Sequence, residues 1–246
     1  MKEILKGIYK GCTAYFEVYG IISRLKLWKF FAIPMLISFL VFSMILLVSF
    51  SFSNAIGSYL ASFWIWDFGQ ETIQTISRIF GGLFIVIIGF ISFKHIIMAL
   101  SAPFMGPISK IIEDDFNGVV SQNSTSTSKG LLLRGIRISL RNLLREFILT
   151  IPILLFGLIP VIGLFSAILL FISQAYFAGF GNMDYTLERH FSYKKSILFV
   201  KNNRGLAIGN GIVFMLFLLI PFVGVILVHP FSVTAATIVT VKSMEK

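Results

Sequence analysis

The chain has 246 residues, of which 57% are hydrophobic and only 13% are charged, and it contains 27 phenylalanines. Soluble domains are about 45–50% apolar and about 25% charged, so this composition excludes an ordinary soluble domain and indicates a multi-pass membrane protein. The net charge of +10 is explained by basic residues that collect on the cytoplasmic side and meet anionic lipids, and we expect no nucleic-acid partner.

The first half of the chain contains two predicted membrane crossings. Residues 1–29 are basic and partly amphipathic, and we expect them to lie on the cytoplasmic membrane surface. Residues 30–52 carry no charge, which predicts the first transmembrane helix. Residues 53–78 form the only loop poor in basic residues and are placed outside, and residues 79–100 are the second crossing. The prolines and glycine of residues 102–107 are expected to end that helix.

Residues 129–146 have the pattern of an amphipathic helix, and residues 184–204 form a second basic connector. The first of these carries a stripe of arginines spaced three, four and four residues apart, at Arg134, Arg137, Arg141 and Arg145. One interpretation is an interfacial helix whose arginines contact lipid phosphates, which makes the anionic lipids of the bilayer a partner. The other is a basic vestibule that concentrates anions. The pattern leaves both open.

Two long apolar runs, at residues 147–183 and 205–241, contain no Asp, Glu, Lys or Arg. Each would be about 55 Å long as a straight helix, whereas a hydrocarbon core of about 30 Å needs roughly 20 residues for one crossing. Each run is therefore too long for one crossing and slightly too short for two. We expect each to be a helical hairpin that is re-entrant or half-penetrating, or that crosses with tight, tilted halves.

The centre of the first run is repeated in the second, 61 residues later, with six of ten positions identical. Each copy holds a proline followed three residues later by a glycine, at Pro160, Gly163, Pro221 and Gly224. Both residue types break helices, so they predict the bends of the hairpins. Paired segments interrupted by Pro and Gly are also a sequence indication of a transport site, which makes these four residues pathway candidates. The alternative is that they serve helix packing alone.

The basic segments on either side of each run predict the topology. If residues 147–183 crossed the membrane once, the connector at residues 184–204 would lie outside, against the positive-inside rule. All basic segments share one side only if each run turns back. We therefore expect a single all-α membrane domain with a cytoplasmic N-terminus. It would hold two long transmembrane helices, two Pro/Gly-broken hairpins and amphipathic basic connector helices.

Two ionisable residues within apolar segments are further pathway candidates. Lys94 either snorkels to the cytoplasmic interface or faces an anion path. His229 either makes a structural hydrogen bond or relays protons. Cys12 is the only cysteine, and no zinc, P-loop or nucleophile–base motif occurs. We therefore expect no catalytic residue, metal or cofactor, and no enzymatic activity.

Three short stretches occur in a familiar order, and the order matters more than any one of them. They are Ala102-Pro103-Phe104, then Asp184-Tyr185 with Arg189 and Lys194, and finally Pro221, Pro230 and Ala235-Ala236-Thr237. Together they resemble the family of CysZ-type sulfate permeases and etoposide-induced proteins, over nearly the whole chain. The resemblance implies an all-helical protein of the inner cell membrane that forms homo-oligomers. It also implies two long crossing helices, two pairs of half-penetrating helices and uptake of sulfate.

In CysZ-type members the anion site lies just before the first crossing, at a Gly-Leu/Ile-Arg-Arg motif. By resemblance, the candidate anion-binding residues here are Arg24, Lys26, Leu27, Trp28 and Lys29. Lys26 stands where the family has glycine, and Trp28 and Lys29 stand where it has arginines. Lysine cannot copy the planar fork with which arginine grips an oxyanion. Three cations near a helix N-terminus still predict an anion site.

These observations favour a permease or channel for an inorganic oxyanion, sulfate or a sulfate-like anion. The alternative is a membrane scaffold or assembly protein without a transported substrate. The missing arginine pair and the surface-binding amphipathic helix favour that alternative.

Overall fold

The computed structural model describes residues 2–63, 70–118, 128–157, 159–220 and 223–244. Every regular element within these ranges is an α-helix, which confirms the predicted fold class. The helices are α1 (Lys2–Thr13), α2 (Tyr15–Arg24), α3 (Trp28–Ala61), α4 (Gln70–Phe116), α5 (Ser128–Gly157), α6 (Pro160–His190), α7 (Tyr193–Asn202), α8 (Arg204–Leu218) and α9 (Val223–Met244).

Four helical segments of the described chain are long and apolar enough to cross a membrane. They are Trp28–Tyr59, Ile91–Phe116, Gly163–His190 and Gly224–Met244. Large apolar side chains are exposed along α3, α5 and α6, which water would penalise and lipid would not. The chain is therefore a multi-pass membrane protein. The first predicted crossing lies within the first segment, but the second segment starts later than the crossing predicted at residues 79–100.

The helices group into two compact units. One unit comprises residues 1–38 and 95–246, and the other comprises residues 39–94. The smaller unit is formed by most of α3 and the first half of α4. Ser49 Oγ donates to the Gly82 carbonyl over 3.1 Å, and the Phe42 and Phe93 rings meet edge to face. Going from Phe42 to Ser49 along α3, the contacting residue in α4 moves back from Phe93 to Gly82, so the two helices run antiparallel in this unit.

The helix α4 continues through the segment that was predicted to end it. Both Pro103 and Pro107 lie inside α4, which runs on to Phe116, so the prediction of a break was wrong. A proline removes a backbone hydrogen bond, but neighbouring helices in a membrane protein supply substitutes. Near the two prolines, α6 bonds other carbonyls of α4: Tyr185 donates its hydroxyl to the Met98 carbonyl, and Arg189 donates to the Gly106 carbonyl over 3.1 Å.

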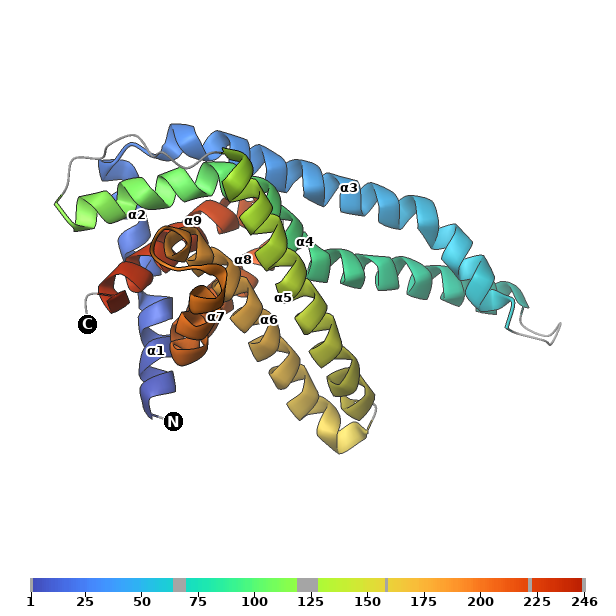
Figure 1. Cartoon of the computed structure of the whole chain (residues 1–246). Coiled ribbons are helices and arrows are strands. Elements are labelled where there is room, and N and C mark those ends of the chain that lie inside the picture. The colour runs from blue at the N-terminus through green and yellow to red at the C-terminus, as the bar shows by residue number, and fades with distance from the viewer. Residues whose placement is uncertain (1, 64–69, 119–127, 158, 221–222, 245–246) are drawn as a thin grey trace. The chain divides into compact units, whose positions relative to one another are not determined.

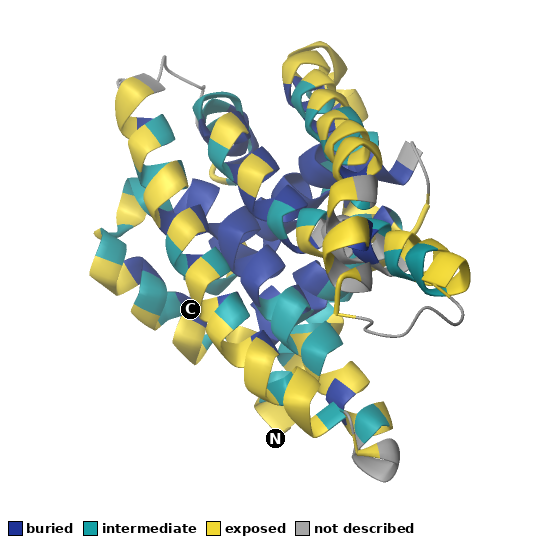
Figure 2. Cartoon of the chain, turned by 90° about the vertical axis from the view of Figure 1, so that its right-hand side faces the viewer, coloured by how far each residue is buried: buried dark blue, intermediate teal, exposed yellow. Residues whose placement is uncertain are grey.

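The core of the larger unit is built on α6, α8 and α9, with α1 and α5 packed against them (Figure 1). Most residues of α8 and of the described α9 are buried, whereas α5 alternates between buried and exposed positions. Figure 2 marks the buried residues in dark blue and the exposed residues in yellow. The helix α8 comes close to α6 because Gly211 has no side chain. A Cβ there would collide with the Ala175 carbonyl.

The two apolar runs fold as helical hairpins, with the arms of each in contact. The helices α5 and α6 lie side by side and meet at a short turn, and α8 and α9 form the second pair (Figure 1). The helices extend beyond the uncharged runs, however. The predicted amphipathic helix at residues 129–146 and the first hairpin arm are one continuous helix, α5. The first residues of the basic connector belong to α6, and the rest form the separate helix α7.

Candidate functional site

The turn between α2 and α3 has the backbone of a Schellman helix end. Lys26 is the only described non-glycine residue with a positive φ, at 52°. The Lys26 N–H donates to the Ser23 carbonyl over 3.2 Å, and the Leu27 N–H donates to the Ile22 carbonyl over 3.0 Å. This pair of backbone bonds ends many helices, usually with glycine in the left-handed position and often with an apolar contact between the residues that here are Leu27 and Ile22. Both Leu27 and Ile22 are fully buried.

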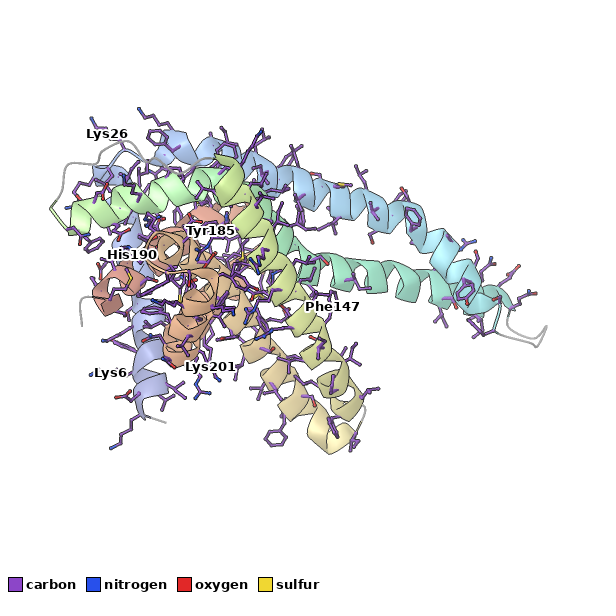
Figure 3. All side chains as sticks on the ribbon, in the orientation of Figure 1. Lys6, Lys26, Phe147, Tyr185, His190 and Lys201 are labelled. Atoms are coloured by element: carbon purple, nitrogen blue, oxygen red, sulfur yellow. The ribbon has the colours of Figure 1, made fainter. Side chains whose placement is uncertain are left out.

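This geometry gives a physical meaning to the replacement of glycine by Lys26. The position requires a left-handed backbone, which costs a non-glycine residue about 1–2 kcal/mol. The buried Leu27 and the two backbone bonds hold the turn in spite of that cost. Lys26 itself is exposed, with its ammonium group in reach of an external anion, and Figure 3 shows it at this turn (Figure 3).

The turn leads directly into the N-terminus of α3, whose first backbone N–H groups are available to an anion. Helix α3 begins at Trp28, so the first N–H groups, including those of Trp28 and Lys29, have no acceptor within the helix. Backbone N–H groups and the helix dipole at this end favour an anion. The exposed Lys29 adds a cation, with its Nζ 5.2 Å from the centre of the Phe30 ring. The Trp28 ring packs against Tyr19 and Phe231, which fixes the start of α3.

Arg24 already has an acidic partner. Its guanidinium forms an ion pair with Asp115, near the end of α4, although its side chain stays 62% exposed. An oxyanion at the turn would compete with the Asp115 carboxylate for Arg24. The structure therefore brings all five predicted anion-site residues to one turn, with Leu27 as a buried anchor and the others around the open helix end.

The hairpin glycines lie where the two arms come closest. A Cβ on Gly163 would be 2.9 Å from the Gly157 carbonyl, and a Cβ on Gly224 would collide with the Phe217 carbonyl. Both glycines thus permit a tight turn at corresponding places in the two hairpins. Pro160 is the first residue of α6, where a proline is favoured. Pro221 lies outside the described residues.

The ionisable pathway candidates are both buried. Lys94 is completely shielded from the surface, so the structure does not place it at an exposed edge. His229 is completely buried in α9, and its Nε2 lies 3.3 Å from the Tyr185 hydroxyl. The Nδ1 of His229 has no hydrogen-bond partner among the residues that the structure describes. The contact between His229 Nε2 and the Tyr185 hydroxyl is compatible with the structural hydrogen bond that the sequence suggested.

A partly buried charge cluster lies elsewhere in the larger unit, between α4 and α6, with Glu113 buried and His190 exposed. Arg189 donates to Glu113 Oε2 over 2.6 Å and also to Ser109 Oγ over 2.7 Å. His190 contacts the other oxygen of the Glu113 carboxylate. Figure 3 shows Tyr185 and His190 on α6 within the surrounding helices. Paired charges of this kind are rarely found inside a membrane protein without a structural or functional role.

A second ion pair involves the first arginine of the predicted stripe. Arg134 binds Asp184 through two nitrogens, over 2.9 and 3.1 Å, and also donates to Ser196 Oγ over 2.8 Å. Arg134 is therefore held by an ion pair within the protein. The Arg137 guanidinium lies over the Tyr193 ring, 4.1 Å from its centre. Burial, followed by the neighbouring charge of Arg145, lowers the pKa of Arg141.

These buried pairs were only partly visible in the sequence. Asp184 and Arg189 are close in the sequence of α6, but the structure pairs each with a residue from another helix. The His95–Glu146 pair, at 2.9 Å, was missed. The sequence feature that could have indicated these pairs is the position of Glu113 and Glu146 next to apolar segments of the chain. A carboxylate that becomes buried there requires a partner.

Comparison with known proteins adds one finding. Residues 14–228 match the model of the family described as Sulfate transporter CysZ/Etoposide-induced protein 2.4. The match begins before the α2–α3 turn and ends within the first residues of α9, so it includes the whole first hairpin, α8 and only the start of α9. No curated protein matches the chain significantly.

Proposed function

Because this chain belongs to the Sulfate transporter CysZ/Etoposide-induced protein 2.4 family, we propose that it is a membrane permease or channel for an oxyanion, sulfate or a sulfate-like anion. The observation that carries the proposal is the α2–α3 turn. There, Lys26 lies just before α3 and Lys29 lies in its first turn, where the backbone N–H groups have no acceptor within the helix. Arg24 adds a third cation, which would release the Asp115 carboxylate when it binds the anion.

The proposed orientation follows from charge. The N-terminus and all basic connectors lie on the cytoplasmic side of the inner cell membrane, and both hairpins turn back within the bilayer. The α2–α3 turn then receives or releases the anion at the cytoplasmic face. Anionic lipids surround the basic connectors, and the protein acts as a homo-oligomer.

Replacing Lys29 tests the anion site directly. Lys29→Ala removes a cation at the helix N-terminus, and we expect sulfate affinity to fall about tenfold, or about 1.4 kcal/mol. Lys2→Ala removes the same charge from the exposed start of α1 and should leave affinity within about twofold. Uptake of labelled sulfate into proteoliposomes, measured against sulfate concentration, gives both values. Equal effects of the two substitutions would remove the site assignment.

The competing function is a scaffold or assembly protein. It is favoured by the ion pair between Arg24 and Asp115, which already neutralises one cation of the turn. A folded protein that carries no sulfate above empty vesicles, and that co-purifies with a stoichiometric protein partner, would establish this alternative.

A further inference from the structure

A second surface of the larger unit combines an apolar groove with unpaired cations. The groove has a volume of about 480 Å³ and is bordered by α5, α6 and α8. Leu149 and Ile153 of α5 face Leu169 and Ile172 of α6 across it. This volume lies within the range of about 300–1,000 Å³ that is typical of small-molecule sites.

The groove ends at two positive charges from the connector. Lys201 lies in the last turn of α7, and Arg204 is the first residue of α8. Both side chains are exposed, and neither forms an ion pair within the described part of the chain. Figure 3 shows Lys201 on α7, which packs against α6. An anionic group at this end would meet two cations without displacing a carboxylate.

The groove also contains polar groups that could accept or donate hydrogen bonds. The hydroxyl groups of Ser173 and Tyr176 line the groove, and Ser173 Oγ has no hydrogen-bond partner among the described residues. The nearby carboxylates face elsewhere, because Glu146 is paired with His95 and Asp184 with Arg134.

We propose that this groove binds one anionic phospholipid, with an acyl chain along α5 and α6 and the phosphate between Lys201 and Arg204. The apolar part lies on a hairpin that exposes large apolar side chains, and the cations lie in the connector at its base. This order matches a lipid whose headgroup lies at the membrane surface and whose tail lies in the bilayer. A second copy of the chain is a poorer occupant, because it has 21 basic against 11 acidic residues.

The test measures binding of a fluorescent-tailed phosphatidylglycerol to the purified full chain in detergent, with phosphatidylcholine as competitor. Each cation near an anionic lipid contributes about fivefold in affinity, so phosphatidylglycerol should bind about thirtyfold more tightly than phosphatidylcholine. The double substitution Lys201→Ala with Arg204→Ala should remove this preference. The matched control, Lys194→Ala with Lys195→Ala, removes two exposed charges of the same helix that do not line the groove, and should change affinity less than about twofold.

A second pair of variants tests the apolar part. Leu169→Trp fills the groove and should weaken binding of both lipids, whereas Ile168→Trp changes the exposed neighbour that does not line it and should not. Thermal unfolding in detergent verifies that each variant is folded. Equal losses from the two lysine-containing pairs would overturn the proposal in favour of general surface charge. Displacement by inorganic phosphate as effective as by the lipid, or an oligomer that Leu169→Trp dissociates without changing lipid affinity, would also overturn it.

Discussion

Lys26 shows how one residue combines a backbone requirement with a charge. Its left-handed conformation is the one that glycine adopts without strain, and its side chain is one of three cations around the start of α3. The family motif has glycine at this position. At this position the chain therefore has a strained backbone and an additional positive charge, whereas the motif has an unstrained, uncharged glycine.

Substitutions at Lys26 separate these two effects. Lys26→Gly and Lys26→Ala both remove the charge, but only glycine relieves the left-handed strain. We expect Lys26→Gly to be more stable than Lys26→Ala by about 1 kcal/mol, with the same loss of sulfate affinity in both. Thermal unfolding and sulfate binding by the two proteins provide the comparison. Equal stability would contradict the assignment of strain to this turn.

At the scale of helices, the arms of both hairpins are held together by backbone contact. Gly163 and Gly224 occupy corresponding places in the repeat, and each lies against a carbonyl of the preceding arm. The repeated pair of proline and glycine thus has a packing role that the structure makes explicit. Any role in an anion path would be additional to it.

Gly224→Ala measures this packing. Its methyl group would collide with the Phe217 carbonyl, which does not yield as a flexible side chain does, so we expect a loss of about 1–3 kcal/mol. Gly130→Ala, in α5, meets nothing within 4 Å and should stabilise the protein by about 0.4–1 kcal/mol. Unfolding of both variants in the same detergent gives the difference. A neutral Gly224→Ala would show that the α8–α9 turn is looser than described.

At the scale of the whole chain, the distribution of positive charge decides the proposed topology. The amphipathic half of α5 and the helix α7 carry most of the basic residues that flank the first hairpin. Both must face the same compartment if that hairpin turns back in the membrane. The argument depends on the positive-inside rule and is independent of the anion.

Accessibility labelling tests the topology in a Cys12→Ala background. Single cysteines at Lys129 and Ser192, both exposed, should react from the cytoplasmic side alone, because both flank the first hairpin. A cysteine at the exposed Ser62 should react from the outside. A membrane-impermeant thiol reagent applied to intact cells and to inverted vesicles distinguishes the sides. Opposite sides for Lys129 and Ser192 would exclude the hairpin topology.

The sequence alone determined the membrane class, the helical fold and the two broken hairpins. Composition, the length of uncharged runs and the repeated Pro/Gly pair are local properties, and the bilayer converts them directly into helices and bends. The family resemblance also pointed to the turn at Lys26, although its left-handed backbone was seen only in the structure.

Only the tertiary structure decided how far the helices extend and which charges pair. The helix α4 continues past Pro103 and Pro107, and side chains from α6 pack against this part of it, with hydrogen bonds to the carbonyls of Met98 and Gly106. Likewise, Arg134 turns inward because Asp184 is brought to it from another helix. Such pairs join residues far apart in the chain. Their energy depends on burial and distance, which a linear pattern of residues does not contain.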